Sequence, residues 1–303
     1  MSGKMTYQKK CLVITCGYFG DILFSTSLAD KLKSEQGFFI VDYLIGFPQM
    51  NRLVQNNKSI DKVYLSSTPS PYPSNNQIDL TQYEKIITLQ PLHFQSPPAY
   101  EHQQFSGIKN PSSSYDVFTE PIYDEVAKTY INELKQDGRR VIALMSNWQP
   151  KTYLFTPEQY IVGIDVPNLG YGGSHRDIPT IVQKLQKQFN IIEVGVPPQY
   201  NQLLTATMED NNQKSLLFEA SLMKFCDAFV GTDGGLATIA AGVGTKTIIT
   251  GDFNLQLYGW NGVIKKIKEP KLGPIHYFPN DGHVVLDPYL TDEEVAAHVI
   301  KLI

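Results

Sequence analysis

Short apolar runs alternate with longer amphipathic segments along most of the 303-residue chain. This alternation is typical of strands of a parallel sheet joined by covering helices. The pattern therefore predicts the α/β class with doubly wound sheets. A chain of 303 residues also favours two domains, because a typical domain holds about 100–200 residues.

The first half of the chain has the pattern of one Rossmann-like domain. Its expected strands are Cys11–Cys16, Phe38–Leu44, Lys62–Leu65 and Lys85–Leu89. Helices are expected after Asp21 and around Gln49–Gln55. Residues 66–76 and 91–114 are rich in Pro, Ser, Asn and Gln, which predicts two long loops without regular elements. Because long loops are often functional, the second is a candidate acceptor-binding or lid segment.

A helix over Glu120–Gln136 is expected to link the two halves, and after it the alternation restarts. The expected strands of the second half are Arg140–Met145, Ile191–Val194, Ala228–Val230 and Thr245–Thr250. Its expected helices are Ile178–Gln188, Leu216–Cys226, Gly234–Gly242 and Thr291–Leu302. We therefore expect an N-terminal domain at 1–137 and a C-terminal domain at 138–303, with a last helix that can pack on either one.

Charge, hydrophobicity and cysteine content argue against several classes of protein. The formal net charge of −4 gives no electrostatic basis for binding nucleic acid. No apolar run approaches the roughly 18 residues of a membrane span, and the first one is too short for a signal peptide. Three cysteines without paired ligand spacing predict neither a disulfide nor a zinc site. We expect a cytoplasmic protein in which any membrane contact is peripheral.

The segment Phe229–Ile249 is the most informative part of the second half. A strand enters a tight turn at Thr232–Gly235, and a helix of small residues begins there. Backbone amides at such a helix start favour a diphosphate, and Asp233 suits sugar or ribose hydroxyls. The alternative is that Asp233 caps the helix and the glycines only make a turn.

A similar strand, turn and helix occupy Cys16–Leu28 in the first half. Asp21 stands near the start of a helix whose inner face carries Leu23, Leu28 and Leu32. In a two-domain arrangement this turn and the Thr232–Gly235 turn can face one cleft, where a carboxylate could remove a proton from an attacking hydroxyl. The alternative is that Asp21 is only a helix N-cap.

Several of these segments carry a resemblance to a known family. The stretches Gly20–Leu28, Val41–Leu44 and Ile60–Val63 resemble the amino half of glycosyltransferase family 9, the bacterial heptosyltransferases. The stretches Ser215–Gly235 and Gly244–Gly251 resemble its carboxy half. Together they lie in the family's order and cover about a third of the chain.

The resemblance implies a GT-B fold, in which two Rossmann-like domains face a central cleft. It also implies an inverting, metal-independent transfer of a sugar from a nucleotide-diphosphate donor to a glycan or glycolipid acceptor, without a further cofactor. Asp21 matches the catalytic base, with Tyr18 and Gly20 on the acceptor side. Thr232, Asp233 and the backbone of Gly234–Leu236 match the donor site.

Other family features are changed or ambiguous. Thr238 stands where the family usually has a histidine. Lys151, His175 and Arg176 compete to contact the β-phosphate, and we favour Arg176. Gly251 and Asp252 begin a loop that lines the donor pocket in the family, with Trp260 further along.

Two rival functions remain open: a GT-B-fold sugar-nucleotide epimerase or hydrolase, and a non-catalytic nucleotide-sugar-binding module. The residues do not name the base, the sugar or the acceptor.

Overall fold

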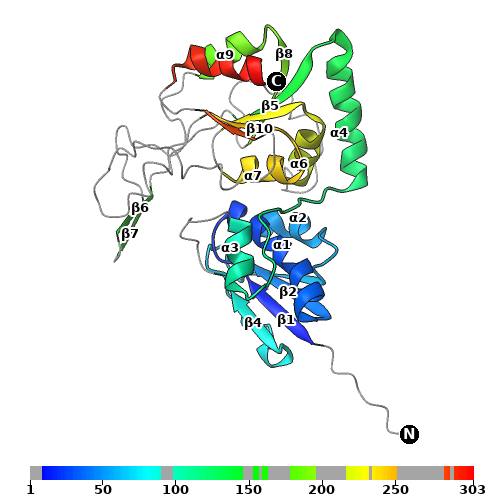
Figure 1. The fold of residues 1–303 in the computed structure, drawn as a ribbon, viewed down its shortest axis with the longest axis vertical. Coiled ribbons are helices and arrows are strands. Elements are labelled where there is room, and N and C mark those ends of the chain that lie inside the picture. Colours follow the sequence, from blue (N-terminus) through cyan, green and yellow to red (C-terminus); the bar gives the residue numbers. More distant parts are fainter. Residues whose placement is uncertain are drawn as a thin grey trace. The chain divides into compact units, whose positions relative to one another are not determined.

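The computed structural model describes residues 9–89, 98–145, 153–156, 159–162, 178–195, 216–231, 234–250, 283–286 and 290–303. The chain divides between Glu120 and Pro121 into two compact units, except that Leu216 and Leu217 group with the first. Each unit is built on its own parallel sheet (Figure 1). The predicted α/β class and the division into two domains are confirmed.

The first unit contains a four-stranded parallel sheet in the order β3-β2-β1-β4. Its strands are β1 (Lys10–Ile14), β2 (Ile40–Ile45), β3 (Lys62–Leu65) and β4 (Lys85–Thr88). Its helices are α1 (Phe19–Gln36), α2 (Asn51–Gln55) and α3 (Pro98–Phe105), with short 3-10 turns η1 (Pro48–Met50) and η2 (Leu80–Gln82). All four predicted strands are present, within a few residues of their expected bounds.

Both faces of this sheet are covered. On one face the buried ring of Tyr43 reaches α1, where its hydroxyl donates a hydrogen bond to the Ser25 carbonyl at 2.7 Å. On the other face Leu12 and Leu44 form a small core with Ile78 and Tyr83. The loop after β3 therefore serves as the second covering layer.

The prediction of a structureless loop over 91–114 is wrong, because α3 occupies Pro98–Phe105 and packs along α1 (Figure 1). Two of its buried residues, His102 and Gln103, are polar and hide the helical pattern in the sequence. Gln103 is stabilised by hydrogen bonds: its Nε2 donates to Ser27 Oγ at 2.9 Å, and its Oε1 accepts from the Ser112 amide at 2.8 Å.

The second unit contains a five-stranded parallel sheet in the order β11-β10-β9-β5-β8. Its strands are β5 (Arg140–Met145), β8 (Phe189–Val194), β9 (Ala228–Gly231), β10 (Thr247–Ile249) and β11 (Val284–Val285). Its helices are α4 (Pro121–Leu134), α5 (Ile178–Leu185), α6 (Leu216–Phe225), α7 (Gly235–Gly242) and α9 (Asp292–Leu302), with a 3-10 turn η3 (Lys135–Asp137). The antiparallel pair β6 (Tyr153–Thr156) and β7 (Gln159–Val162) and the short β11 were not predicted.

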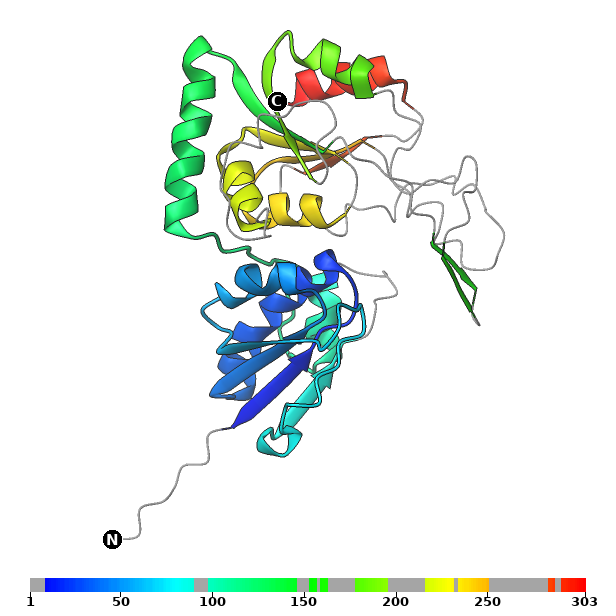
Figure 2. The same ribbon diagram turned by 180° about the vertical axis from the view of Figure 1, so that it is seen from behind.

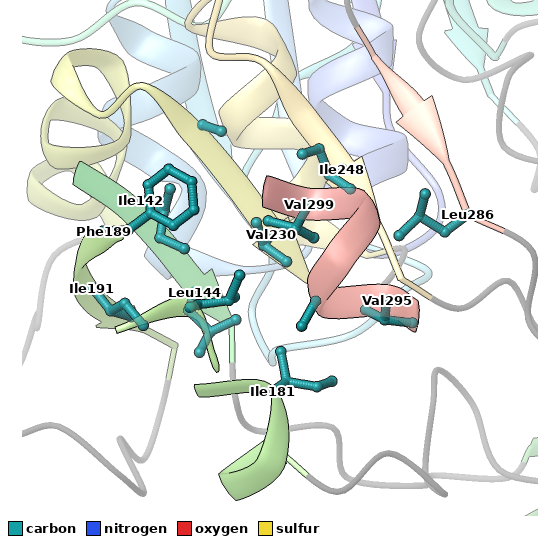
Figure 3. Close-up of a cluster of buried hydrophobic side chains, with 13 residues drawn as sticks. Ile142, Leu144, Ile181, Phe189, Ile191, Val230, Ile248, Leu286, Val295 and Val299 are labelled. Atoms are coloured by element: carbon teal, nitrogen blue, oxygen red, sulfur yellow. The ribbon is translucent and has the colours of Figure 1, made fainter. Parts of the chain in front are cut away.

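The last helix packs on the second unit, which settles the choice left open by the sequence. Helices α5 and α9 lie side by side over one face of the sheet (Figures 1 and 2). Their contact with the strands forms a hydrophobic core (Figure 3) that includes Ile142, Leu144, Ile181, Val230, Ile248, Val295 and Val299. A capping box starts α9, in which the Glu294 amide donates to Thr291 Oγ1 at 3.2 Å and the Thr291 amide donates to Glu294 Oε2 at 2.8 Å.

The contacts assign α4 to the second unit, whereas we expected the boundary after Asp137. Asp124 on α4 accepts hydrogen bonds from two residues of α6, Ser221 Oγ at 2.9 Å and Lys224 Nζ at 2.7 Å. The rings of Tyr123 and Phe218 also meet, at 6.3 Å between centroids. Helix α4 is therefore packed against the second unit and is more than a connection between the two units.

Candidate active site

Each of the two glycine turns found in the sequence follows a strand that lies where the strand order of its sheet reverses. In open parallel sheets, ligands bind outside the carboxyl ends of the strands where the strand order reverses. In the first sheet the reversal lies between β1 and β4, and β1 leads into the turn before α1. In the second it lies between β5 and β9, and β9 leads into the turn before α7.

Asp21 is the third residue of α1, not its N-cap. The N-cap is Tyr18, whose backbone amide donates to Asp21 Oδ2 at 2.8 Å. The carboxylate therefore folds back over the first turn, as the acidic residue of a capping box does. Its capping bond uses one carboxylate oxygen.

Gly17 makes room for this carboxylate. Its φ angle is 112°, and a Cβ atom at this residue would lie 2.3 Å from Asp21 Oδ2. Any larger residue would have to push the carboxylate away. The Gly17 amide also donates to the Pro71 carbonyl at 2.7 Å, which attaches the loop after β3 beside Asp21.

The surroundings of Asp21 make its carboxyl a weaker acid than an ordinary aspartate. Burial raises the pKa of Asp21 to about 6, although the amides of Tyr18 and Asp21 itself oppose this shift. Nearby Cys16 is buried, and both burial and the Asp21 charge raise the pKa of its thiol. A carboxyl with a pKa near 6 is mostly ionised at neutral pH yet is a better proton acceptor than an ordinary aspartate.

His102 is a second buried group near Asp21, and the sequence pattern did not predict it. Burial lowers the pKa of His102 to about 3, while the Asp21 backbone acts in the opposite direction. Neither ring nitrogen makes a hydrogen bond of ordinary geometry to a described residue. The imidazole is thus neutral at physiological pH, and it adds no positive charge beside the carboxylate.

Aromatic rings flank the same turn. Tyr18 is 49% exposed and stacks on Phe47, with ring centroids 5.8 Å apart and an interplanar angle of 23°. Phe19 meets Phe47 edge to face at 5.3 Å. Phe47 was missed, although an aromatic residue three positions after the predicted strand Phe38–Leu44 was the available signal. Gly20, the other expected acceptor-side residue, lies partly exposed in the first turn of α1.

The turn before α7 supplies backbone groups. Gly234 is the N-cap of α7, with φ 154° and ψ −170°, a conformation essentially restricted to glycine. It has no side chain to satisfy the first amides of the helix, so the amides of Gly235 and Leu236 lack an intrahelical acceptor. Such amides, aligned with the helix dipole, are suited to hold an anion.

The strand ends beside this turn are packed closely. A Cβ atom at Gly195, which follows β8, would lie 3.3 Å from Leu236 Cδ1. A Cβ atom at Gly231, the last residue of β9, would lie 2.8 Å from Met145 Cβ. Small residues therefore let α7 and the strand ends approach one another at this edge.

Thr238, which we expected at the position of a histidine in glycosyltransferase family 9, is 3% exposed. Its hydroxyl donates to the Gly234 carbonyl at 3.1 Å, next to the backbone bond from its own amide at 3.0 Å. The side chain thus reinforces the first turn of α7. Six expected donor-site residues lie outside the described residues: Lys151, Arg176, Thr232, Asp233, Gly251 and Asp252. His175 and Trp260 also lie outside them.

Within the described ranges no group of three or more His, Cys, Asp and Glu side chains is arranged to hold a metal ion. The three cysteines are free thiols. None of the helices in this part of the chain is long and apolar enough to cross a membrane.

Comparisons with known proteins identify the fold. No family model and no curated protein matches the sequence. The structure is similar to a glycosyl transferase of family 9 from Veillonella parvula, with a TM-score of 0.62, 12% identity and coverage of 99% of this chain and 98% of that one. It is also similar to the E. coli ADP-heptose lipopolysaccharide heptosyltransferase II, with a TM-score of 0.55, 12% identity and coverage of 97% and 98%.

The chain has the two-domain fold of these glycosyltransferases. A third similar structure is TibC from enterotoxigenic E. coli, with a TM-score of 0.56, 11% identity and coverage of 97% of this chain and 76% of that one. TibC is described as an iron-containing, dodecameric glycosyltransferase. The family resemblance drawn from the sequence is thus confirmed in the fold.

Proposed function

We propose that this protein is an inverting, metal-independent glycosyltransferase that moves a sugar from a nucleotide-diphosphate sugar to a hydroxyl of a glycan or glycolipid acceptor. The donor resembles ADP-heptose, which one similar structure contains. The protein acts in the cytoplasm, where it can contact a membrane peripherally to reach a lipid-linked acceptor.

One observation carries the proposal. At the switch point of each sheet, a glycine-containing turn leads into a helix, and the two turns offer complementary chemistry. The first presents the Asp21 carboxylate, whose pKa burial raises to about 6. The second presents the first amides of α7, which follow Gly234 and have no intrahelical acceptor. A base and an anion site are the two parts that a metal-independent sugar transfer requires.

The reaction follows from these roles. Asp21 removes the proton of the acceptor hydroxyl as its oxygen attacks the anomeric carbon. A new glycosidic bond forms while the bond from that carbon to the β-phosphate oxygen breaks, and the nucleoside diphosphate departs with the electron pair. The amides of Gly235 and Leu236 stabilise its growing negative charge together with Arg176 or Lys151, while Asp233 accepts hydrogen bonds from hydroxyls of the sugar. One displacement of this kind inverts the anomeric configuration.

The proposal is tested by incubating the chain with nucleotide sugars, ADP-heptose included, with and without acceptors. We expect product only with an acceptor, with inverted configuration, and undiminished in the presence of EDTA. Release of free sugar or nucleotide without an acceptor would instead support the epimerase or hydrolase. Binding without turnover under any condition would support the non-catalytic module.

Two variants separate the roles of the two turns. Asp21→Asn should lose transfer but keep donor binding, whereas Asp233→Ala should lose the thermal stabilisation that the donor gives. A crystal structure with both donor and acceptor bound offers a direct check. If the Asp21 carboxylate lay far beyond the hydrogen-bond reach of about 3 Å from the reacting hydroxyl of the acceptor, the base assignment would be wrong.

A further inference from the structure

The carboxyl edge of the first sheet carries a rigid aromatic surface beside Asp21. Tyr18 stacks on Phe47, and the Tyr18 residue is half exposed. Phe47 follows Gly46, where a Cβ atom would lie 1.7 Å from the Ser70 carbonyl oxygen. The Ser70 amide in turn donates to the Gly46 carbonyl at 3.1 Å. The strand end that bears Phe47 is therefore fixed against the loop after β3.

The described segments at this edge carry little charge. The segments that follow β1, β2 and β3, residues 15–22, 46–52 and 66–77, contain one acidic residue, Asp21, and one basic residue, Arg52. Arg52 is engaged with Glu120: its Nε donates to Oε1 at 3.1 Å and its Nη2 to Oε2 at 2.5 Å. Within these segments, the positive charge of Arg52 is balanced locally, and Asp21 remains as the net charge.

Short polar side chains complete the surface. Residues 66–77 are mainly Ser, Thr, Pro, Asn and Gln, and the loop is fastened internally. Asn75 Nδ2 donates to the Leu65 carbonyl at 2.8 Å, and Ser66 Oγ donates to the Ser74 carbonyl at 3.2 Å. Neutral hydroxyl and amide groups around an exposed aromatic ring are a typical lining of a site for a small polar ligand with an apolar face.

We propose that the acceptor is an uncharged sugar, which stacks its apolar C–H face on Tyr18 and Phe47 and turns a hydroxyl toward Asp21. The slightly positive C–H groups of a sugar ring complement the negative face of an aromatic ring. An acceptor with a carboxylate or phosphate next to the reacting hydroxyl would instead meet the like charge of Asp21. This inference rests on the proposed transferase function and adds the class of its acceptor.

The test uses matched pairs of sugars that differ at one group. Saturation-transfer NMR on the full chain compares the methyl glycosides of glucose, galactose and mannose with the corresponding methyl uronates, which carry a carboxylate at C6. We expect at least one neutral glycoside to bind about tenfold more tightly than its uronate at neutral pH. Tyr18→Ala should weaken that binding about tenfold, and Tyr18→Phe should retain it.

Phe39→Ala is the matched control, because Phe39 is an aromatic residue 65% exposed at the opposite, amino end of β2. It should leave glycoside binding unchanged. Equal or tighter binding of every uronate, or glycoside binding that does not depend on Tyr18, would overturn the inference. Absence of any glycoside signal would overturn it as well.

Kinetics distinguish this inference from the proposed function. With an active donor, Tyr18→Ala should raise KM for the neutral acceptor about tenfold and leave KM for the donor unchanged. A raised donor KM would show that the rings hold a nucleobase, and the inference would fail while the transferase function stood. Failure of all transfer, with the Tyr18-dependent NMR binding intact, would refute the transferase function, and the surface would remain a site for a neutral sugar that is not an acceptor.

Discussion

The Asp21 carboxylate fills the space beside Gly17 at the start of α1. A Cβ atom added at Gly17 would lie only 2.3 Å from Asp21 Oδ2. The same glycine has a φ angle of 112°, so it permits both the backbone turn and the position of the carboxylate. The base and the glycine before it therefore form one structural unit.

Gly17→Ala should displace the carboxylate and reduce transfer at least tenfold, with a loss of about 1–3 kcal/mol in the free energy of unfolding. Gly37→Ala is the control. Gly37 ends the same helix with a φ angle of 72°, and a Cβ atom there would meet nothing within 4 Å. It should lower stability by a comparable amount but leave the rate of transfer unchanged, as steady-state kinetics and urea unfolding would show.

The rate of transfer should depend on the ionisation of Asp21. Because a base must be deprotonated and burial raises the pKa of Asp21 to about 6, kcat/KM for the acceptor should rise with pH through about 6 and then level off. A rate profile from pH 4.5 to 8.5 measures this. A flat profile across that range would argue against Asp21 as the base.

Asp21 should also leave a signature in stability. The folded protein holds the Asp21 proton more tightly than the unfolded chain, since the pKa rises from 3.8 to about 6. The contribution is therefore fully present below pH 4 and is lost as pH rises through about 6. Relative to Asp21→Asn, the wild type should lose on the order of 2 kcal/mol between pH 4 and pH 7.

Urea unfolding of both proteins across this pH range gives the comparison. Asp30→Asn, which removes an exposed carboxylate from the same helix, controls for the change in net charge. A stability difference between wild type and Asp21→Asn that stayed constant with pH would contradict the raised pKa.

Gly234→Ala should weaken donor binding. Its backbone conformation is essentially restricted to glycine, so a side chain would shift the amides at the start of α7. We expect at least a tenfold rise in Kd for ADP, measured by calorimetry. Gly244→Ala provides the control, because Gly244 has a φ angle of 85° just after α7 with nothing within 4 Å of a Cβ atom. It should lower stability and leave ADP affinity unaltered.

The second unit should require α4 for its stability. Asp124 bonds to Ser221 and Lys224 of α6, so a fragment of residues 121–303 should melt cooperatively and at a higher temperature than residues 138–303. Asp124→Ala in the full chain removes these bonds alone, so it should lower the free energy of unfolding by about 1–2 kcal/mol. Equal melting of the two fragments would restore the boundary after Asp137 that the sequence indicated.

Local patterns in the chain were enough to predict much of the fold. Strands such as Lys62–Leu65 and Arg140–Met145 were found with their observed bounds, since an apolar run between polar turns needs no tertiary information. The capping box of Thr291 and Glu294 was found for the same reason. By contrast, α3 was missed because its buried face includes His102 and Gln103, whose burial depends on packing against α1.

Some features of the candidate site were likewise predictable from the sequence, and others were not. By itself, the sequence determined which residue types follow each strand: a carboxylate after β1 and glycines after β9, because backbone conformation at a turn is a local property. Only the tertiary structure decided that both turns lie where the strand order reverses, that burial raises the pKa of Asp21, and that Phe47 stands beside Tyr18. Strand order, burial and contacts between distant residues arise from packing, which no local pattern encodes.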